Sequence, residues 1–202
     1  LSNPKAEAFT KNFTGQWLDL RDINFTEPDP NLYPEFDELL RISMVRETEL
    51  FFQEILNNDL SLLNFVDSGF TFLNSRLASH YGIGGVTGQE FRKVRLPPGS
   101  ERGGLLTQAS ILKITANGTY TSPVLRGVWV LENILGHPTA PPPDNVGAVE
   151  PDTRGAITLR EQLAKHRDVK SCSACHQRID PPGFALECFD PIGGFRERYR
   201  TM

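Results

Sequence analysis

Three residues near the C-terminal end of the chain form the pattern Cys172-Ser-Ala-Cys175-His176. Two thiols three positions apart, followed at once by an imidazole, are the pattern by which haem c is attached to a protein. Cys172 and Cys175 would form thioethers with the two vinyl groups of one porphyrin, and His176 would bind the iron on its proximal side. The motif therefore predicts one covalently bound haem c.

The residues that follow the motif, Ile179-Asp-Pro-Pro-Gly-Phe184, predict a rigid loop against this haem. A proline-rich loop at Pro181 can offer a backbone carbonyl to the second ring nitrogen of His176, and such a bond fixes the orientation of the imidazole. Gly183 would let the backbone approach the porphyrin closely, and Phe184 can pack against its face or edge. The haem propionates need cationic partners, for which the candidates are Arg126, Arg167, Lys170 and Arg178.

The distal side of the iron is not set by the local sequence. His166 lies ten residues before His176, and a helix–turn–helix could fold it over the opposite haem face. Met44 and then His80 are the next candidates for the distal ligand, followed by His137 and Met202. Each of the first three also has an ordinary interpretation. His166 would be a helix C-terminal imidazole, Met44 a core methionine and His80 a helix-end residue.

Two other uses of the motif stay open. A haem with an open distal site would bind small ligands or act as a haem enzyme, rather than only carry electrons. Cys172, Cys175 and His176, with His166 as a fourth ligand, could instead bind zinc in an interaction domain. Structural zinc sites usually use two separated ligand pairs, however, and directly adjacent Cys and His residues fit one tetrahedron poorly. No other pattern in the sequence predicts a catalytic site.

The composition is that of a globular chain, with 39% hydrophobic and 23% charged residues. A net charge of -4 argues against nucleic-acid binding, which needs a basic surface. No apolar run is long enough to span a membrane. Because the chain begins Leu-Ser-Asn-Pro and shows no signal peptide, we expect a fragment of a longer exported precursor. Haem c is attached outside the bacterial cytoplasm, so the expected location is the periplasm or the exterior.

Helical periodicity dominates the chain. The predicted helices cover residues 4–20, 35–56, 60–66 (capped by Asp59), 70–81, 105–114, 124–135 and 158–167. On helix 35–56, Glu47 and Glu49 are assigned to the charged faces. A short strand is predicted over 91–96, and a proline-rich connector over about 138–156 is the clearest internal boundary.

The segment from His166 to Arg196, with its C-x-x-C-H motif and Ile179-Asp-Pro-Pro-Gly-Phe-Ala-Leu-Glu187, resembles the planctomycete cytochrome-c-like domain of large multidomain proteins. Arg102-Gly-Gly-Leu-Leu-Thr107 matches the same domain. Residues 9–82 resemble the helical domain that precedes it, for example at His80-Tyr-Gly-Ile83. The resemblance implies an exported bacterial haem c protein, and further modules in the full-length chain.

We therefore predict a mainly α fold, in which a helical domain (1–82) packs on a cytochrome-c-like haem domain (83–202) with long irregular and Pro-rich loops. The expected function is extracytoplasmic electron transfer by one haem c. The expected partner is a redox protein or the adjacent domains of the full-length chain, with no nucleic acid and no membrane span in this segment.

Overall fold

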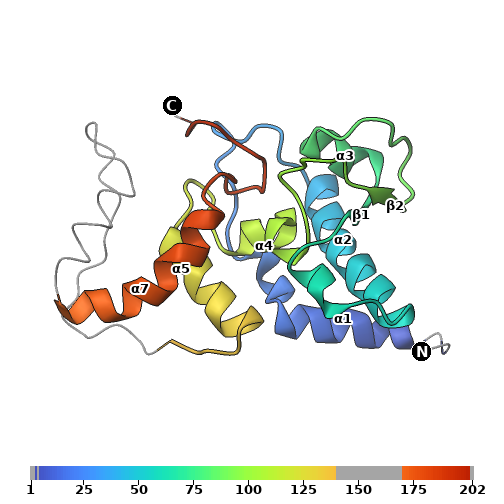
Figure 1. Ribbon diagram of the computed structural model, residues 1–202. Helices are drawn as coiled ribbons and strands as arrows, with labels where there is room; N and C mark the ends of the chain where they lie inside the picture. Colours follow the sequence, from blue (N-terminus) through green and yellow to red (C-terminus); the bar gives the residue numbers. More distant parts are fainter. Residues whose placement is uncertain (1–2, 4, 140–169, 201–202) are drawn as a thin grey trace. The chain divides into compact units, whose positions relative to one another are not determined.

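The structure, a computed structural model, describes residue 3 and residues 5–139 and 170–200. It divides the chain into two compact units. Unit 1 comprises residues 1–122 and 186–202, and unit 2 comprises residues 123–185. The described residues are mainly helical, with one two-stranded sheet (Figure 1), as predicted. Within this described part, no helix has the length and hydropathy needed to cross a membrane.

Unit 1 contains most of the helices that the structure describes. Their bounds are α1 (Ala6–Trp17), η1 (Leu20–Asn24), α2 (Glu38–Asn57), η2 (Leu62–Phe65), α3 (Ser75–Tyr81), η3 (Leu105–Thr107) and α4 (Ala109–Ile114). Side-chain caps begin α2 and α3: Asp37 accepts a hydrogen bond from the Leu40 N–H, and Asn74 accepts one from the Leu77 N–H. The predicted end of helix 70–81 is confirmed: α3 ends at Tyr81, and Gly82 after it adopts a φ of 68°, which glycine tolerates.

The sheet of unit 1 pairs β1 (Phe70–Leu73) with β2 (Arg92–Arg95) in antiparallel register, with Phe70 opposite Arg95. The predicted strand at 91–96 is confirmed. The predicted helix over 70–81 is wrong in its first five residues. Half-buried and buried positions alternate along β1 with the period of a strand, and Asn74 is the extended N-cap of α3. At 60–66 only the short 3-10 helix η2 forms, and Ser61 rather than Asp59 caps it.

The hydrophobic core of unit 1 surrounds Met44, which is completely buried. Residues from widely separated parts of the chain meet there. They are Leu32, Tyr33, Leu40, Leu73, Leu77, Ala78, Ala109 and Ile192. Because burying a large aliphatic side chain contributes roughly 1.5–3 kcal/mol, Ile192 ties the C-terminal segment firmly to this unit.

The described part of unit 2 contains α5 (Pro123–Trp129), η4 (Val130–Ile134) and α7 (Lys170–Ala185). The predicted helix 124–135 is confirmed as α5 followed by the π-helical turn η4. The predicted connector 138–156 lies outside the described residues from 140 onwards, and the predicted helix 158–167 lies entirely outside them. The proposed division at residue 82 stays a prediction, while the compact units divide the chain at residues 122 and 186.

Two glycines allow α5 and α7 to pack at very short range. A Cβ on Gly127 of α5 would lie 1.9 Å from the carbonyl oxygen of Ile179, and one on Gly183 of α7 would lie 1.8 Å from that of Pro123. Because Pro123 to Gly127 runs against Gly183 to Ile179, the helices are antiparallel. The sequence predicts that Gly183 lets the backbone approach a porphyrin closely. In the structure, Gly183 lies against Pro123 of α5.

Candidate functional site

The Cys-x-x-Cys-His motif lies in the first half of α7 (Figure 1). Residues three and four positions apart share one face of a helix. Positions 172, 175 and 176 therefore lie on one face of α7. The Cys175 thiol is exposed. The His176 side chain is only 14% exposed to solvent. The imidazole therefore packs against the protein, while the Cys175 thiol beside it is accessible.

Asp180 determines how the His176 ring is held. Its carboxylate lies one helical turn further along α7, is 1% exposed, and accepts a hydrogen bond of 2.8 Å from His176 Nδ1. A neutral imidazole that donates from Nδ1 has its lone pair on Nε2. The expected proline carbonyl is not this acceptor. Since α7 continues through Pro181 and Pro182 to Ala185, the segment predicted as a loop is helical and the i+4 carboxylate reaches the ring instead.

The other residues predicted at the site fall into three places. Arg126 and Phe184 belong to unit 2. Arg126 is completely buried on α5, and Phe184 is partly buried on α7. His166 and Arg167 lie outside the described residues. Met44 and His80 lie in unit 1.

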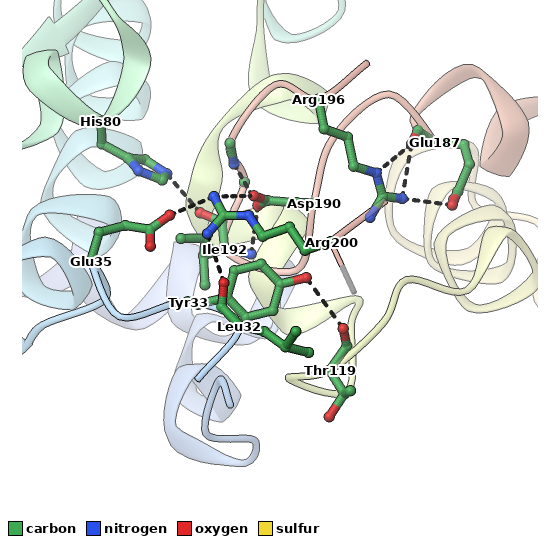
Figure 2. A network of polar contacts seen from close by, with 12 residues as sticks. Leu32, Tyr33, Glu35, His80, Thr119, Glu187, Asp190, Ile192, Arg196 and Arg200 are labelled. Carbon is green, nitrogen blue, oxygen red and sulfur yellow. Dashed lines mark hydrogen bonds and ion pairs between the residues drawn. The ribbon is translucent and has the colours of Figure 1, made fainter. Parts of the chain in front are cut away.

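The two distal-ligand candidates in unit 1 already have protein partners. Met44 is enclosed by the hydrophobic core. His80 Nε2 lies 2.8 Å from the carbonyl oxygen of Ile192, and burial lowers the pKa of His80 from 6.5 to about 4. The ring is therefore neutral at neutral pH, and Nε2–H donates to Ile192 (Figure 2). Either side chain would have to give up these contacts to bind a metal, and its role as an iron ligand stays a prediction.

A buried carboxylate in unit 1 was not predicted. Glu47 is 1% exposed and accepts hydrogen bonds of 2.6 Å from Thr71 Oγ1 and 2.5 Å from the Tyr81 hydroxyl. Burial raises the pKa of Glu47 to about 7, and it raises that of Tyr81 well above its usual value. The Arg102 guanidinium lies 3.5 Å from the centre of the Tyr81 ring. The helical spacing of Glu47 could have indicated its burial. Glu47 follows Met44 by three residues and precedes Phe51 by four, which places it on the apolar side of α2.

A polar network holds the C-terminal segment, residues 186–200, on unit 1 (Figure 2). Arg200 donates to Glu35 at 2.5 Å and to the Leu32 carbonyl at 2.8 Å. The Asp190 carboxylate accepts hydrogen bonds from the backbone N–H groups of residues 192 and 194. Local sequence patterns do not show the contacts of Arg200, because Leu32 and Glu35 lie 168 and 165 positions away in the chain.

A smaller part of this network joins the two points at which the chain passes between the units. Thr121 Oγ1 donates to Glu187 Oε1 at 2.6 Å, and Arg196 donates to both residues. Thr121 lies just before unit 2 in the sequence, and Glu187 lies just after it. Unit 2 is therefore an insertion whose two ends are fixed side by side.

Replacing His80 with Gln should protect unit 1 against acid. An unfolded histidine takes up a proton below about pH 6.5, whereas folded His80 stays neutral down to about pH 4. The burial of His80 therefore contributes a loss of stability of about 2 kcal/mol as the pH falls across this interval, once residual solvent exposure is allowed for. Gln keeps a donor for the Ile192 carbonyl and does not titrate.

The measurement is the free energy of unfolding in urea across this pH interval. We expect the variant to gain stability relative to the wild type as the pH falls. His137→Gln, at an exposed position of unit 2, is the matched control. A difference between H80Q and the wild type that does not change with pH would contradict the assignment.

Comparison with known families matches both halves of the chain. Residues 102–199 match PSCyt3, a protein of unknown function (DUF1588), and residues 1–83 match PSD4, a protein of unknown function (DUF1592). Both are domains of planctomycete-type multidomain proteins, which supports that part of the resemblance. Neither description assigns a function or a cofactor. No curated protein and no solved structure matches the chain.

Proposed function

We propose that this chain, which combines the two planctomycete-type domains, carries one haem c attached through Cys172 and Cys175, with His176 as the proximal iron ligand. The observation that supports this most strongly is the hydrogen bond from His176 Nδ1 to the buried Asp180 carboxylate. Metal-binding histidines almost always donate their second ring N–H to a carboxylate, a carbonyl or water, which fixes the ring and its tautomer.

The residues of α7 fit such a group. Two cysteine positions, three apart in the sequence, share a helix face with the adjacent histidine, and the Cys175 thiol is accessible. When bound, haem would supply one-electron iron chemistry. The protein would fix the ring through two thioethers and one oriented imidazole. Pro181 and Phe184 are proposed to contact the porphyrin. Arg167 and the buried Arg126 are proposed as partners of its propionates.

Electron transfer outside the cytoplasm is the activity we propose. The partner would be a redox protein or a neighbouring domain of the full-length chain. We propose electron transfer because a covalent attachment would retain the cofactor through repeated oxidation and reduction. The acidic net charge of -4 would suit a basic partner surface. His166 is the proposed distal ligand.

One observation favours a second function. In unit 1, Met44 and His80 are both held by protein contacts. If His166 does not bind the iron either, the distal position is open, and the haem could bind a small ligand or act as an enzyme. Zinc binding by the motif is a third hypothesis. Among the described residues no cluster of three or more His, Cys, Asp or Glu side chains could hold a metal ion, but Cys172 and His166 fall outside the described side chains.

The test is to export the chain in a bacterium that attaches haem c, and to measure the Soret band and the mass of the denatured protein. We expect the mass of one covalently bound haem, lost in the double variant Cys172→Ser/Cys175→Ser. Cys188→Ser is the matched control and should keep the haem, because that residue lies outside the motif. Wild-type protein that is exported without covalent haem, or that contains zinc, would refute the proposal.

A spectrum distinguishes the first two functions. Low-spin spectra that do not change on adding CO support electron transfer with two protein ligands. If His166→Ala leaves them unchanged while Met44→Ala does not, the proposed distal ligand is wrong. Immediate CO binding by the wild type would support the open site.

A further inference from the structure

The acceptor for the His176 ring is a carboxylate on its own helix. His176 Nδ1 and Asp180 Oδ1 are 2.8 Å apart, and the Asp180 side chain is 1% exposed. Asp180 cannot easily move away, since its neighbour Ile179 lies against Gly127 of α5 and Gly183 lies against Pro123. The helix packing therefore keeps the carboxylate next to the imidazole.

A carboxylate acts on an imidazole differently from a backbone carbonyl. Hydrogen bonds to an ionised acceptor are shorter and roughly twice as strong as neutral ones. A carboxylate pulls the Nδ1 proton more strongly and makes the other nitrogen a more basic ligand. Because Asp180 is shielded from water, its charge is also less screened than a charge at the surface would be. Both effects stabilise the more positive oxidation state of a metal bound at Nε2.

We propose that Asp180 is a positioning residue that makes His176 an electron-rich proximal ligand and sets a low reduction potential for the haem. This inference rests on the proposed function, since it concerns the same site. It specifies the chemistry of that site. The chain would hold its iron predominantly ferric under conditions in which a carbonyl-bonded histidine would allow reduction. It would thus be suited to donate electrons to an acceptor of modest potential.

The test compares Asp180→Asn with the wild type in the haem-loaded chain by redox titration. Asn has nearly the same shape and can still accept from Nδ1, but it carries no charge. We expect at least a tenfold higher ratio of ferrous to ferric protein at a fixed ambient potential, which corresponds to a midpoint about 59 mV higher. The control is Glu132→Gln, which removes one carboxylate from an exposed position of unit 2. A shift in D180N no larger than that in E132Q would overturn the proposal.

If D180N loses its haem, the wild type still decides the question. In the diamagnetic ferrous protein under CO, NMR reports the Nδ1 proton of His176. A chemical shift far downfield, as for a proton bonded to a carboxylate, supports the proposal, and the shift of a carbonyl-bonded imidazole overturns it. Failure of the proposed function is distinguishable, because in that case the exported wild type has no covalent haem to titrate.

Discussion

Replacing Glu47 with Gln is expected to make unit 1 increasingly more stable than the wild type as the pH rises from 4.5 to 7. The advantage should reach about 3 kcal/mol at the upper end, since one pKa unit corresponds to about 1.4 kcal/mol. The cause is the complete burial of the carboxyl group, which raises the pKa of Glu47 from 4.5 to about 7. This is the largest effect of pH on stability that we expect in the chain.

The sign follows from the proton balance. Between pH 4.5 and 7 an unfolded Glu47 is ionised, while the folded one keeps its proton, so unfolding releases a proton and becomes easier as the pH rises. Below pH 4.5 both states are protonated and the effect disappears. Hydrogen bonds from Thr71 and Tyr81, and the nearby Arg102, partly offset the burial but do not cancel it.

Gln fits the site because each partner can adapt. The Tyr81 hydroxyl accepts from the Ala109 N–H at 2.8 Å and donates its own proton to residue 47. The side-chain oxygen of the introduced glutamine can accept that bond, while its amide faces the Thr71 hydroxyl, which rotates to accept. Urea unfolding at several pH values gives the difference from the wild type. Glu54→Gln on α2, which removes an ion pair with Lys93, is the control. A constant difference for E47Q would refute the assignment.

Glu47 and His80 act in opposite directions on unit 1. Burial of Glu47 lowers stability as the pH rises to about 7, and burial of His80 lowers stability as the pH falls to about 4. The two contributions largely compensate each other in the wild type. Each single variant is therefore expected to reveal the slope of the other group, upward with pH in E47Q and downward in H80Q.

The second large effect is expected from Gly183→Ala, which should destabilise unit 2 by about 3 kcal/mol or more. The new Cβ would lie 1.8 Å from the Pro123 carbonyl oxygen, so α5 and α7 must separate. Gly127→Ala should act in the same way through the Ile179 carbonyl, at 1.9 Å. Because either substitution forces the same separation, the double variant should cost less than the sum of the two.

Hydrogen exchange of the α5 and α7 peptides measures this effect directly, and we expect faster exchange there with no change in unit 1. Gly84→Ala is the matched control, because no atom lies within 4 Å of its Cβ position. Equal exchange in G183A and the wild type would show that the helices do not pack as described.

Much of the fold could be predicted from local sequence, for identifiable reasons. Helical periodicity located α1 and α2, and the predicted helices 70–81 and 124–135 end directly before Gly82 and Gly136, which both adopt a positive φ. The four residues of β1 were assigned to a helix, because so short an apolar run shows no clear period. At the candidate site, the prolines suggested a loop. Had α7 been predicted to continue through Pro181, the i+4 spacing would have indicated Asp180 as the partner of His176.

The contacts that could not be predicted join distant segments. The pairing of His80 with Ile192, and of Arg200 with Glu35, follows only from the tertiary structure. Glu47 appeared to be one charge among several on α2. The spacing from Met44 and Phe51 indicates its burial, but no local pattern indicates its hydrogen-bond partners Thr71 and Tyr81.

The insertion of unit 2 has a consequence for the order in which the protein is made. A ribosome completes residues 1–122 and then synthesises all of unit 2 before Ile192 emerges. Until then the core of unit 1 lacks a side chain that is completely buried in the finished protein, and Arg196 cannot yet join Thr121 to Glu187. The first 122 residues must therefore wait, incompletely packed, for the residues from 186 onwards. Incompletely packed chains expose apolar surface, which makes them prone to aggregation during synthesis.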